Sequence, residues 1–384
     1  MASVVDTAPL VLDVGAVLLV AATSGLLARK VGLPAIVGYL LTGLLVSPFT
    51  PGFVADSQQI AILADIGVVL LLFEVGIEID LRRIRKEHGA ILWASPTLVF
   101  LGTIAATPIF MGLGLSLYGS ALIALSIAMS SSVVIVNITR SRRRTTSVAT
   151  EDALLGWSVL QDITGVALAA FVIAILGDSG ENPIQSVLGL VGFGIAAYVA
   201  SKLLPYLLRV IRWESDLFLI YSVAIGLFIA ALGTVVFGIP MALASFVAGL
   251  AINQNRDTDQ VRKAVLPFRD LFQVLFFVVI GSLVEPALIK DALPFAGAIL
   301  GVMVLIKTIP AFLLSRFKQV ADNAAQLAVG LSQVGEFSFV LGSAALAAGA
   351  ITKVQFTGVL LAVIVSIIIS TLAVRRASRV SRSI

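Results

Sequence analysis

Residues 149–177 read ATEDALLGWSVLQDITGVALAAFVIAILG, an apolar run in which Asp162 is the only charged residue after position 152. A helix needs about 20 mostly apolar residues to cross a bilayer, and this run is longer than that. Transmembrane β-strands would instead appear as alternating segments of about ten residues. The stretch therefore predicts a membrane-spanning helix with one carboxylate near its centre.

The rest of the chain has the same character. Of its 384 residues, 59% are hydrophobic and 12% are charged, whereas soluble domains average about 45–50% apolar and about 25% charged residues. The mean hydropathy is +1.07. Cysteine is absent and His88 is the only histidine, which excludes disulfides and thiolate sites and argues against histidine-based metal or hydrolytic chemistry. We expect an integral membrane protein that is not an enzyme and has no cofactor.

Apolar runs of spanning length recur along the whole sequence, and the first one is expected to be a helix rather than a cleaved signal peptide. No Gly-rich nucleotide-binding segment is found, so we expect one transmembrane domain over residues 1–384 with no soluble regulatory domain. Thirteen spans are predicted, at about 9–29, 33–50, 58–80, 89–115, 118–139, 149–177, 184–211, 216–237, 240–253, 265–284, 290–315, 322–349 and 354–374.

Basic residues indicate how these spans are oriented. Twenty-two of the 26 Lys and Arg residues lie in every second loop and in the C-terminal tail. Positive charge marks the cytoplasmic side, which predicts a multi-pass protein of the cell (inner) membrane with its N-terminus outside and its C-terminus in the cytoplasm. The net charge of +4 is therefore a topology signal, and no nucleic-acid partner is expected.

An odd number of spans predicts an inverted repeat. Spans 1–6 and spans 8–13 would have opposite orientations if span 7 joins them, and inverted repeats are a common transporter architecture. The fold class predicted is therefore all-α, with two six-helix units related as inverted repeats. This inference rests on topology, because the two halves show no convincing sequence identity.

Two of the predicted spans carry polar residues at their midpoints. The span at 118–139 contains Ser130, Ser131 and Ser132, and small hydroxyl residues can bond to the backbone and let a helix unwind. The span at 322–349 occupies the corresponding place in the second repeat. Interrupted helices at matching positions point to a transport site. The broken-helix motif of the second span includes Gln333, Gly335 and Glu336.

Ionisable residues at bilayer depth are functional candidates. Asp162, Lys307 and Glu336 lie near the centres of their spans. A single buried aspartate can be a structural hydrogen-bond partner, but Asp162 coincides in depth with Lys307 and both helix breaks, which favours a transport role. For Glu336, a role in neutralising a helix end is equally open. Asp65 and Glu74 are better explained by a funnel lining or by pairing with basic groups.

These groups predict cation and proton exchange at one carboxylate. Asp162 can hold a proton, pair with Lys307 or coordinate a desolvated cation, and these states exclude each other. Competition between H⁺ and a monovalent cation for one site is antiport, and one exchangeable carboxylate suggests 1:1 exchange. Gln161 and the three serines at 130–132 would add neutral oxygen ligands.

The motifs resemble the Kef-type branch of the monovalent cation:proton antiporter (CPA2) superfamily. The Gln-Asp helix of that branch is similar to Leu160-Gln161-Asp162-Ile163, and its broken helix is similar to Gly335-Glu336-Phe337-Ser338-Phe339-Val340. Its third helix is similar to the stretch from Ile66 through Phe73. The resemblance implies a thirteen-helix, sodium/proton antiporter-like fold with two broken crossing helices. It also implies a homodimer, an elevator-type movement, Asp162 as ion carrier with Lys307 as its partner, and K⁺ as the cation. Kef-type proteins usually carry a cytoplasmic nucleotide-binding domain after the last helix, and none is found here. The chain would then be either part of a longer protein or a member that is regulated differently, for example by a separate regulatory subunit.

Other functions are kept as alternatives. A Na⁺/H⁺ antiporter would use the same site with another ion, and a sodium-coupled symporter of an organic anion would need a wide polar cavity and a second sodium site. A channel-like efflux pathway is a third alternative, against which competition at a single site argues. The expected partners are membrane lipid, monovalent cations and protons, and a second copy of the chain.

Overall fold

All elements in the part of the chain that the structure describes are helical. The structure is a computed structural model and is described here for residues 8–50, 57–78, 89–131, 134–135, 146–177, 183–211, 214–239, 241–252, 258–318, 321–335 and 337–380. The predicted all-α class is confirmed. The structure also divides the chain into two compact units, which are described separately below.

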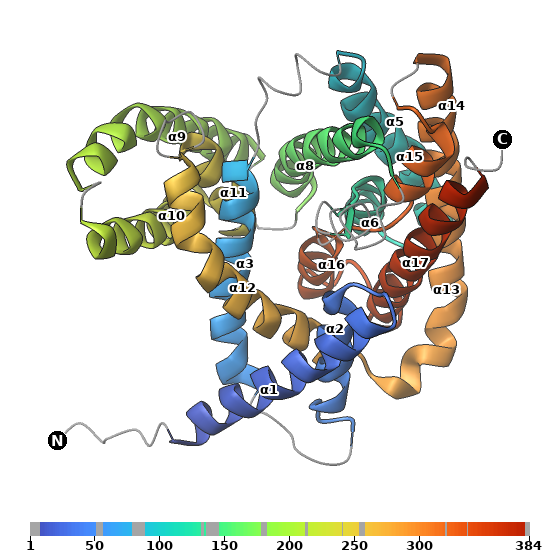
Figure 1. The fold of residues 1–384 in the computed structure, drawn as a ribbon, viewed down its shortest axis with the longest axis horizontal. Coiled ribbons are helices and arrows are strands. Elements are labelled where there is room, and N and C mark those ends of the chain that lie inside the picture. The colour runs from blue at the N-terminus through green and yellow to red at the C-terminus, as the bar shows by residue number, and fades with distance from the viewer. Residues whose placement is uncertain are drawn as a thin grey trace. The chain divides into compact units, whose positions relative to one another are not determined.

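Unit 1 comprises Met1–Ile79 and Ile184–Pro286. Its helices are α1 (Ala8–Lys30), α2 (Ala35–Leu45), α3 (Ser57–Glu78), α9 (Pro183–Ile211, whose first residue precedes the unit boundary), α10 (Ser215–Phe237), α11 (Met241–Ile252) and α12 (Thr258–Ser282). Helix α3 packs against α11 and α12 (Figure 1), and 72% of its apolar span is buried. It is therefore the central helix of unit 1.

Glycine allows α3 and α11 to approach each other closely. A Cβ atom on Gly249 of α11 would meet the carbonyl oxygen of Phe73, and one on Gly76 of α3 would meet the carbonyl oxygen of Phe246. Helices in lipid associate through such small-residue contacts because lipid tails offer no hydrophobic driving force between helices.

A buried carboxylate connects α3 to α12. Glu74 is 1% exposed and accepts hydrogen bonds from Nε of Arg262 at 2.7 Å and from Nη1 of Arg269 at 2.6 Å. Arg269 also pairs with Asp270 at 2.6 Å. The expectation that Glu74 pairs with basic groups is thus met by two arginines of α12.

Unit 2 comprises Asp80–Pro183 and Ala287–Ile384. Its longer helices are α5 (Ile91–Gly112), α6 (Leu117–Ala128), α8 (Val148–Leu176), α13 (Ile289–Met303) and α17 (Lys353–Val380). Shorter elements are the π-turn η2 (Val304–Thr308), α14 (Ile309–Lys318), α15 (Ala324–Leu331) and α16 (Phe337–Ala347); the 3₁₀ turn η1 (Pro286–Leu288) lies where the chain passes from unit 1 to unit 2.

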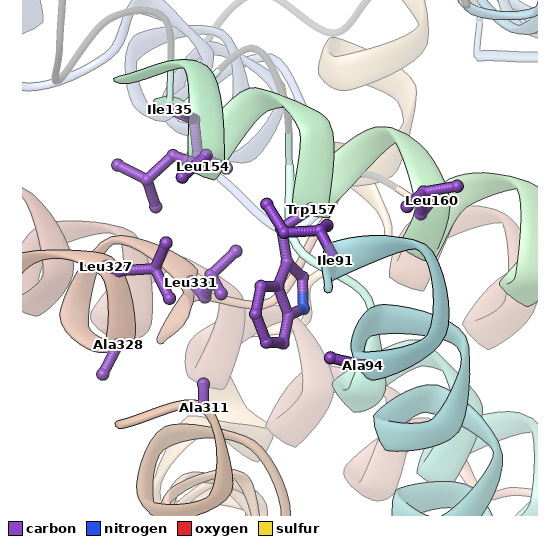
Figure 2. Close-up of a cluster of buried hydrophobic side chains, with 11 residues drawn as sticks. Ile91, Ala94, Ile135, Leu154, Trp157, Leu160, Ala311, Leu327, Ala328 and Leu331 are labelled. Carbon is purple, nitrogen blue, oxygen red and sulfur yellow. The ribbon is translucent and has the colours of Figure 1, made fainter. Parts of the chain in front are cut away.

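An apolar cluster holds the two sequence halves of unit 2 together. Trp157 of α8 is fully buried, and Figure 2 shows its indole ring between Ile91 and Ala94 of α5 and Leu331 of α15. The hydroxyl of Ser95 donates to the carbonyl oxygen of Trp157 at 2.9 Å. The cluster fixes α8, which carries Asp162, against α15, which ends at the second helix break.

Eight helices of the described residues are long and apolar enough to cross a membrane, and five shorter apolar helices accompany them. Each of the thirteen predicted spans overlaps at least one of the helices given above. The multi-pass character is therefore established, whereas the number of thirteen spans and the inverted repeat remain predictions.

Candidate functional site

Helices α6 and α15 both end inside unit 2, at the polar segments singled out in the sequence. Helix α6 ends at Ala128, and Met129 after it is extended, with φ −92° and ψ 148°. Helix α15 ends at Leu331, and Ser332 after it has φ −79° and ψ 55°. The chain resumes as α16 at Phe337. Serine and glycine favour such breaks because their hydroxyls and small size stabilise non-helical backbone.

We call the segment that follows α6, from Met129, the first break, and the segment between α15 and α16, from Ser332, the second break. The two breaks are joined by hydrogen bonds. The side-chain amide of Gln333 accepts a hydrogen bond from the Ser131 N–H at 3.0 Å and donates one to the Ser131 carbonyl at 3.0 Å. The Ser130 hydroxyl donates to the Leu331 carbonyl at 2.7 Å. The Gly335 N–H donates to the Met129 carbonyl at 3.2 Å. These four bonds pair backbone groups that the breaks release from their helices.

Lys307 lies between the two breaks. Its side chain is 2% exposed, and its ammonium donates to the carbonyl oxygens of Met129 at 2.9 Å and Gln333 at 2.7 Å. Both acceptors are main-chain groups, so the expected ion pair between Lys307 and Asp162 stays a prediction. The residue belongs to the π-turn η2, where the Ile309 N–H reaches back to Val304. The turn ends just before Pro310, which cannot continue a regular hydrogen-bond ladder.

Helix α8 brings Asp162 and Gln161 into the same unit. Asp162 is 2% exposed and Gln161 is fully buried. Among the described residues, neither amide atom of Gln161 has a hydrogen-bond partner. A Cβ atom on Gly165 would collide with the Met129 side chain, so α8 packs closely on the first break. Asp162 and Gly165 are three residues apart and share a helix face, which directs Asp162 toward that break.

Helix α17 supports the second break through residues that the sequence analysis did not single out. The Val334 N–H donates to the Ser366 hydroxyl at 3.0 Å, and the Ser370 hydroxyl donates to the Val329 carbonyl at 2.7 Å. Thr308 shares a hydrogen bond of 2.7 Å with Ser332. The only sequence signal was two serines four residues apart in an apolar span, which places them on one helix face.

The structure thus brings most of the predicted site residues together in unit 2. Asp162 and Gln161 come from α8, Ser130 and Ser131 from the first break, Lys307 from η2, and Gln333 and Gly335 from the second break. Ser132 and Glu336 were also predicted as site residues, and they lie outside the described residues.

Oxygen atoms dominate this site. They belong to the Asp162 carboxylate, the Gln161 amide, the serine hydroxyls and the carbonyls at the ends of α6 and α15. Such hard oxygen donors suit hard cations rather than the soft metals that prefer thiolate ligands. Within the described ranges, no group of three or more His, Cys, Asp or Glu residues could hold a metal ion.

Comparisons with known proteins identify the family of the chain. A family model described as "Sodium/hydrogen exchanger, transmembrane" matches residues 16–379. The chain is 28% identical over 376 residues to the putative cation/proton antiporter YbaL of Escherichia coli K12, covering 94% of this chain and 67% of that protein.

Solved structures show the same fold. The sodium proton antiporter MjNhaP1 from Methanocaldococcus jannaschii at pH 8 matches with a TM-score of 0.66 and 17% identity, covering 97% of this chain and 99% of that one. A second structure, an electron-microscopy map of MjNhaP1, matches with a TM-score of 0.61 and 16% identity, covering 96% and 94%.

Proposed function

The chain belongs to the sodium/hydrogen exchanger family, and from this premise we propose that it exchanges K⁺ for H⁺, with both ions competing for Asp162. Membership of the cation:proton antiporter superfamily, expected from the motifs, is confirmed, and the chain is a transporter rather than an enzyme. The Kef-type branch stays a prediction.

The observation that carries the proposal is the environment of Asp162. Its carboxylate is buried in an apolar span and lies on the helix face that meets the first break. The residue before it, Gln161, is buried with an amide that has no hydrogen-bond partner among the described residues. Burying an ionisable group at such a position costs free energy, so these groups are rare in membrane spans and usually have a function. A proton or a desolvated monovalent cation can each neutralise the Asp162 carboxylate, and one carboxylate cannot hold both charges at once.

The choice of ion rests on the Gln161-Asp162 pair, which resembles the potassium-handling members of the superfamily. Na⁺/H⁺ exchange is the second candidate, because the matching family is described as a sodium/hydrogen exchanger and MjNhaP1 as a sodium proton antiporter. A sodium-coupled symporter is a more distant alternative.

We further propose an elevator-type movement in a homodimer, with the N-terminus outside the inner membrane and the C-terminus in the cytoplasm. The division into two compact units supports this, because Asp162, Lys307 and both breaks all belong to unit 2. A unit that contains the whole ion site can move as one body, which is what alternating access by rigid-body displacement requires.

Proton flux in proteoliposomes tests the proposed function. A pH-sensitive dye is trapped inside, an acid-inside gradient is imposed, and K⁺, Na⁺ or Li⁺ is added outside at matched ionic strength. We expect dye recovery with K⁺ for the wild type and for Asp216→Asn, a control at the exposed start of α10, and no recovery for Asp162→Asn.

Two results of this assay would change the proposal. Recovery with Na⁺ alone would keep the mechanism and replace the ion. Wild-type exchange by Asp162→Asn would refute the single-carboxylate mechanism.

A further inference from the structure

The ammonium group of Lys307 is held as a bound cation would be held. Its two hydrogen bonds go to the carbonyl oxygens of Met129 and Gln333, at 2.9 and 2.7 Å, and the side chain is 2% exposed. Both oxygens are main-chain groups that the helix breaks have released from their own helices. In transport proteins, carbonyls of unwound backbone and of half-helix ends coordinate cations.

The electrostatics of the two helix ends favour a single positive charge at this place. Met129 follows the last residue of α6, and Gln333 follows the end of α15 by two residues. Each helix C-terminus carries about −0.5 elementary charge, so two such ends together balance about one monovalent cation. Lys307 supplies that charge from a third element, η2.

The surrounding hydrogen bonds keep the two carbonyls in place independently of Lys307. Gln333 is held by the two bonds of its side chain to Ser131. The Met129 carbonyl also accepts the Gly335 N–H, and the Val334 N–H is bound by Ser366. The site is therefore built by the crossing of the breaks and not by the lysine.

We propose that the carbonyl oxygens of Met129 and Gln333 form a monovalent cation site, which the Lys307 ammonium fills in this structure. A small cation and the ammonium exclude each other there, so the lysine acts as a tethered competitor of the ion. In the proposed exchange, these two carbonyl oxygens would be additional ligands of the cation. The inference rests on the proposed function at one point only, namely that the competing ion is the transported one.

Thermal unfolding of the purified full chain tests the site without any need for ion flux. Lys307→Met keeps most of the buried aliphatic chain and removes the charge. In choline chloride we expect this variant to unfold several degrees below the wild type. Replacing choline by K⁺, Na⁺ or methylammonium at constant ionic strength should recover most of the loss, and the effect should saturate.

The wild type and Lys290→Met should respond less, because in both the Lys307 ammonium already fills the site. Lys290 is an exposed lysine in the first turn of α13. An equal response of all three proteins, or no recovery of Lys307→Met, would overturn the proposal. If the variant cannot be purified folded in choline, purification in methylammonium decides: folded protein supports the site, and aggregation in both salts counts against it.

A double variant separates this site from Asp162. Lys307→Met combined with Asp162→Asn should retain the saturable cation response, because the carbonyl ligands are unchanged. Loss of the response would assign the cation to Asp162 and overturn a separate carbonyl site. Because stability is measured and not transport, failure of the proposed exchange and failure of this site give distinguishable results.

Discussion

The side-chain amide of Gln333 pairs with both main-chain groups of Ser131, through two hydrogen bonds of 3.0 Å. In this geometry a side chain takes the place of a neighbouring peptide group and satisfies a backbone segment that has left its helix. The main-chain carbonyl of Gln333 also accepts a hydrogen bond from the Lys307 ammonium. One residue therefore connects the first break, the second break and the buried charge.

Replacing Gln333 should weaken the crossing in a way that depends on chemistry. Gln333→Leu removes both amide hydrogen bonds to Ser131, whose carbonyl also accepts the Ile135 N–H at 3.2 Å, and a buried polar group that loses a partner costs about 1–3 kcal/mol. Gln333→Glu keeps an acceptor for the N–H but loses the donor and sets a carboxylate against the Ser131 carbonyl. We expect both variants to unfold at lower temperature and to lose exchange activity.

Gln260→Leu is the matched control for these variants, because Gln260 is exposed on α12 and its replacement should leave the unfolding temperature nearly unchanged. A Gln333→Leu protein as stable as this control would show that the amide pair contributes nothing.

The sequence predicted the elements of the site better than their contacts. Asp162, Lys307 and the serine run could be found because charged and hydroxyl residues are rare at the centres of apolar spans. The acceptors of Lys307 could not, since every residue has a carbonyl group and only the helix breaks free those of Met129 and Gln333. The Glu74–Arg269 pair spans 195 positions, and one sequence does not show which distant residues meet.

Trp157 should be a major source of stability in unit 2. Its ring fills the cluster between α5, α8 and α15 (Figure 2), and truncating a buried aromatic residue to alanine costs about 3–5 kcal/mol. Among the described residues its Nε1 group has no hydrogen-bond partner. Trp157→Phe therefore loses ring volume but no hydrogen bond, and we expect it to be much closer to the wild type.

Thermal unfolding monitored in detergent would compare the two Trp157 variants. Equal losses for Trp157→Phe and Trp157→Ala would mean that the indole N–H, and not the ring, determines the contribution of this residue.

The close approach of α3 and α11 depends on Gly249. A methyl group there would collide with the Phe73 carbonyl, a main-chain atom that cannot rotate away. Gly249→Ala should therefore separate the helices and cost about 1–3 kcal/mol, as overpacking does. Gly15→Ala in α1 meets no atom within 4 Å, and it should be neutral or slightly stabilising because alanine favours helix formation. The difference in unfolding temperature between Gly249→Ala and Gly15→Ala measures how much stability depends on the close contact of α3 and α11. Similar unfolding temperatures for the two variants would argue against that dependence.

Glu74 should stabilise unit 1 as the shared partner of two arginines. Glu74→Gln removes the buried negative charge and leaves Arg262 and Arg269 facing a neutral amide. Breaking a buried ion pair by removing one partner costs about 3–5 kcal/mol, and less where a partner reaches water. The side chain of Arg269 is 17% exposed and that of Arg262 is 35% exposed. We therefore expect Arg269→Gln to lower the unfolding temperature more than Arg262→Gln does.

The salt dependence of these variants distinguishes a buried pair from a surface pair. Screening acts mainly on exposed charges, so the loss caused by Glu74→Gln should persist at high ionic strength, whereas a loss that disappears with added salt would show that the carboxylate is in contact with solvent. Because Glu74 and both arginines belong to unit 1, the proposed ion site in unit 2 keeps all its residues. Exchange by folded Glu74→Gln protein should therefore retain the wild-type choice of cation.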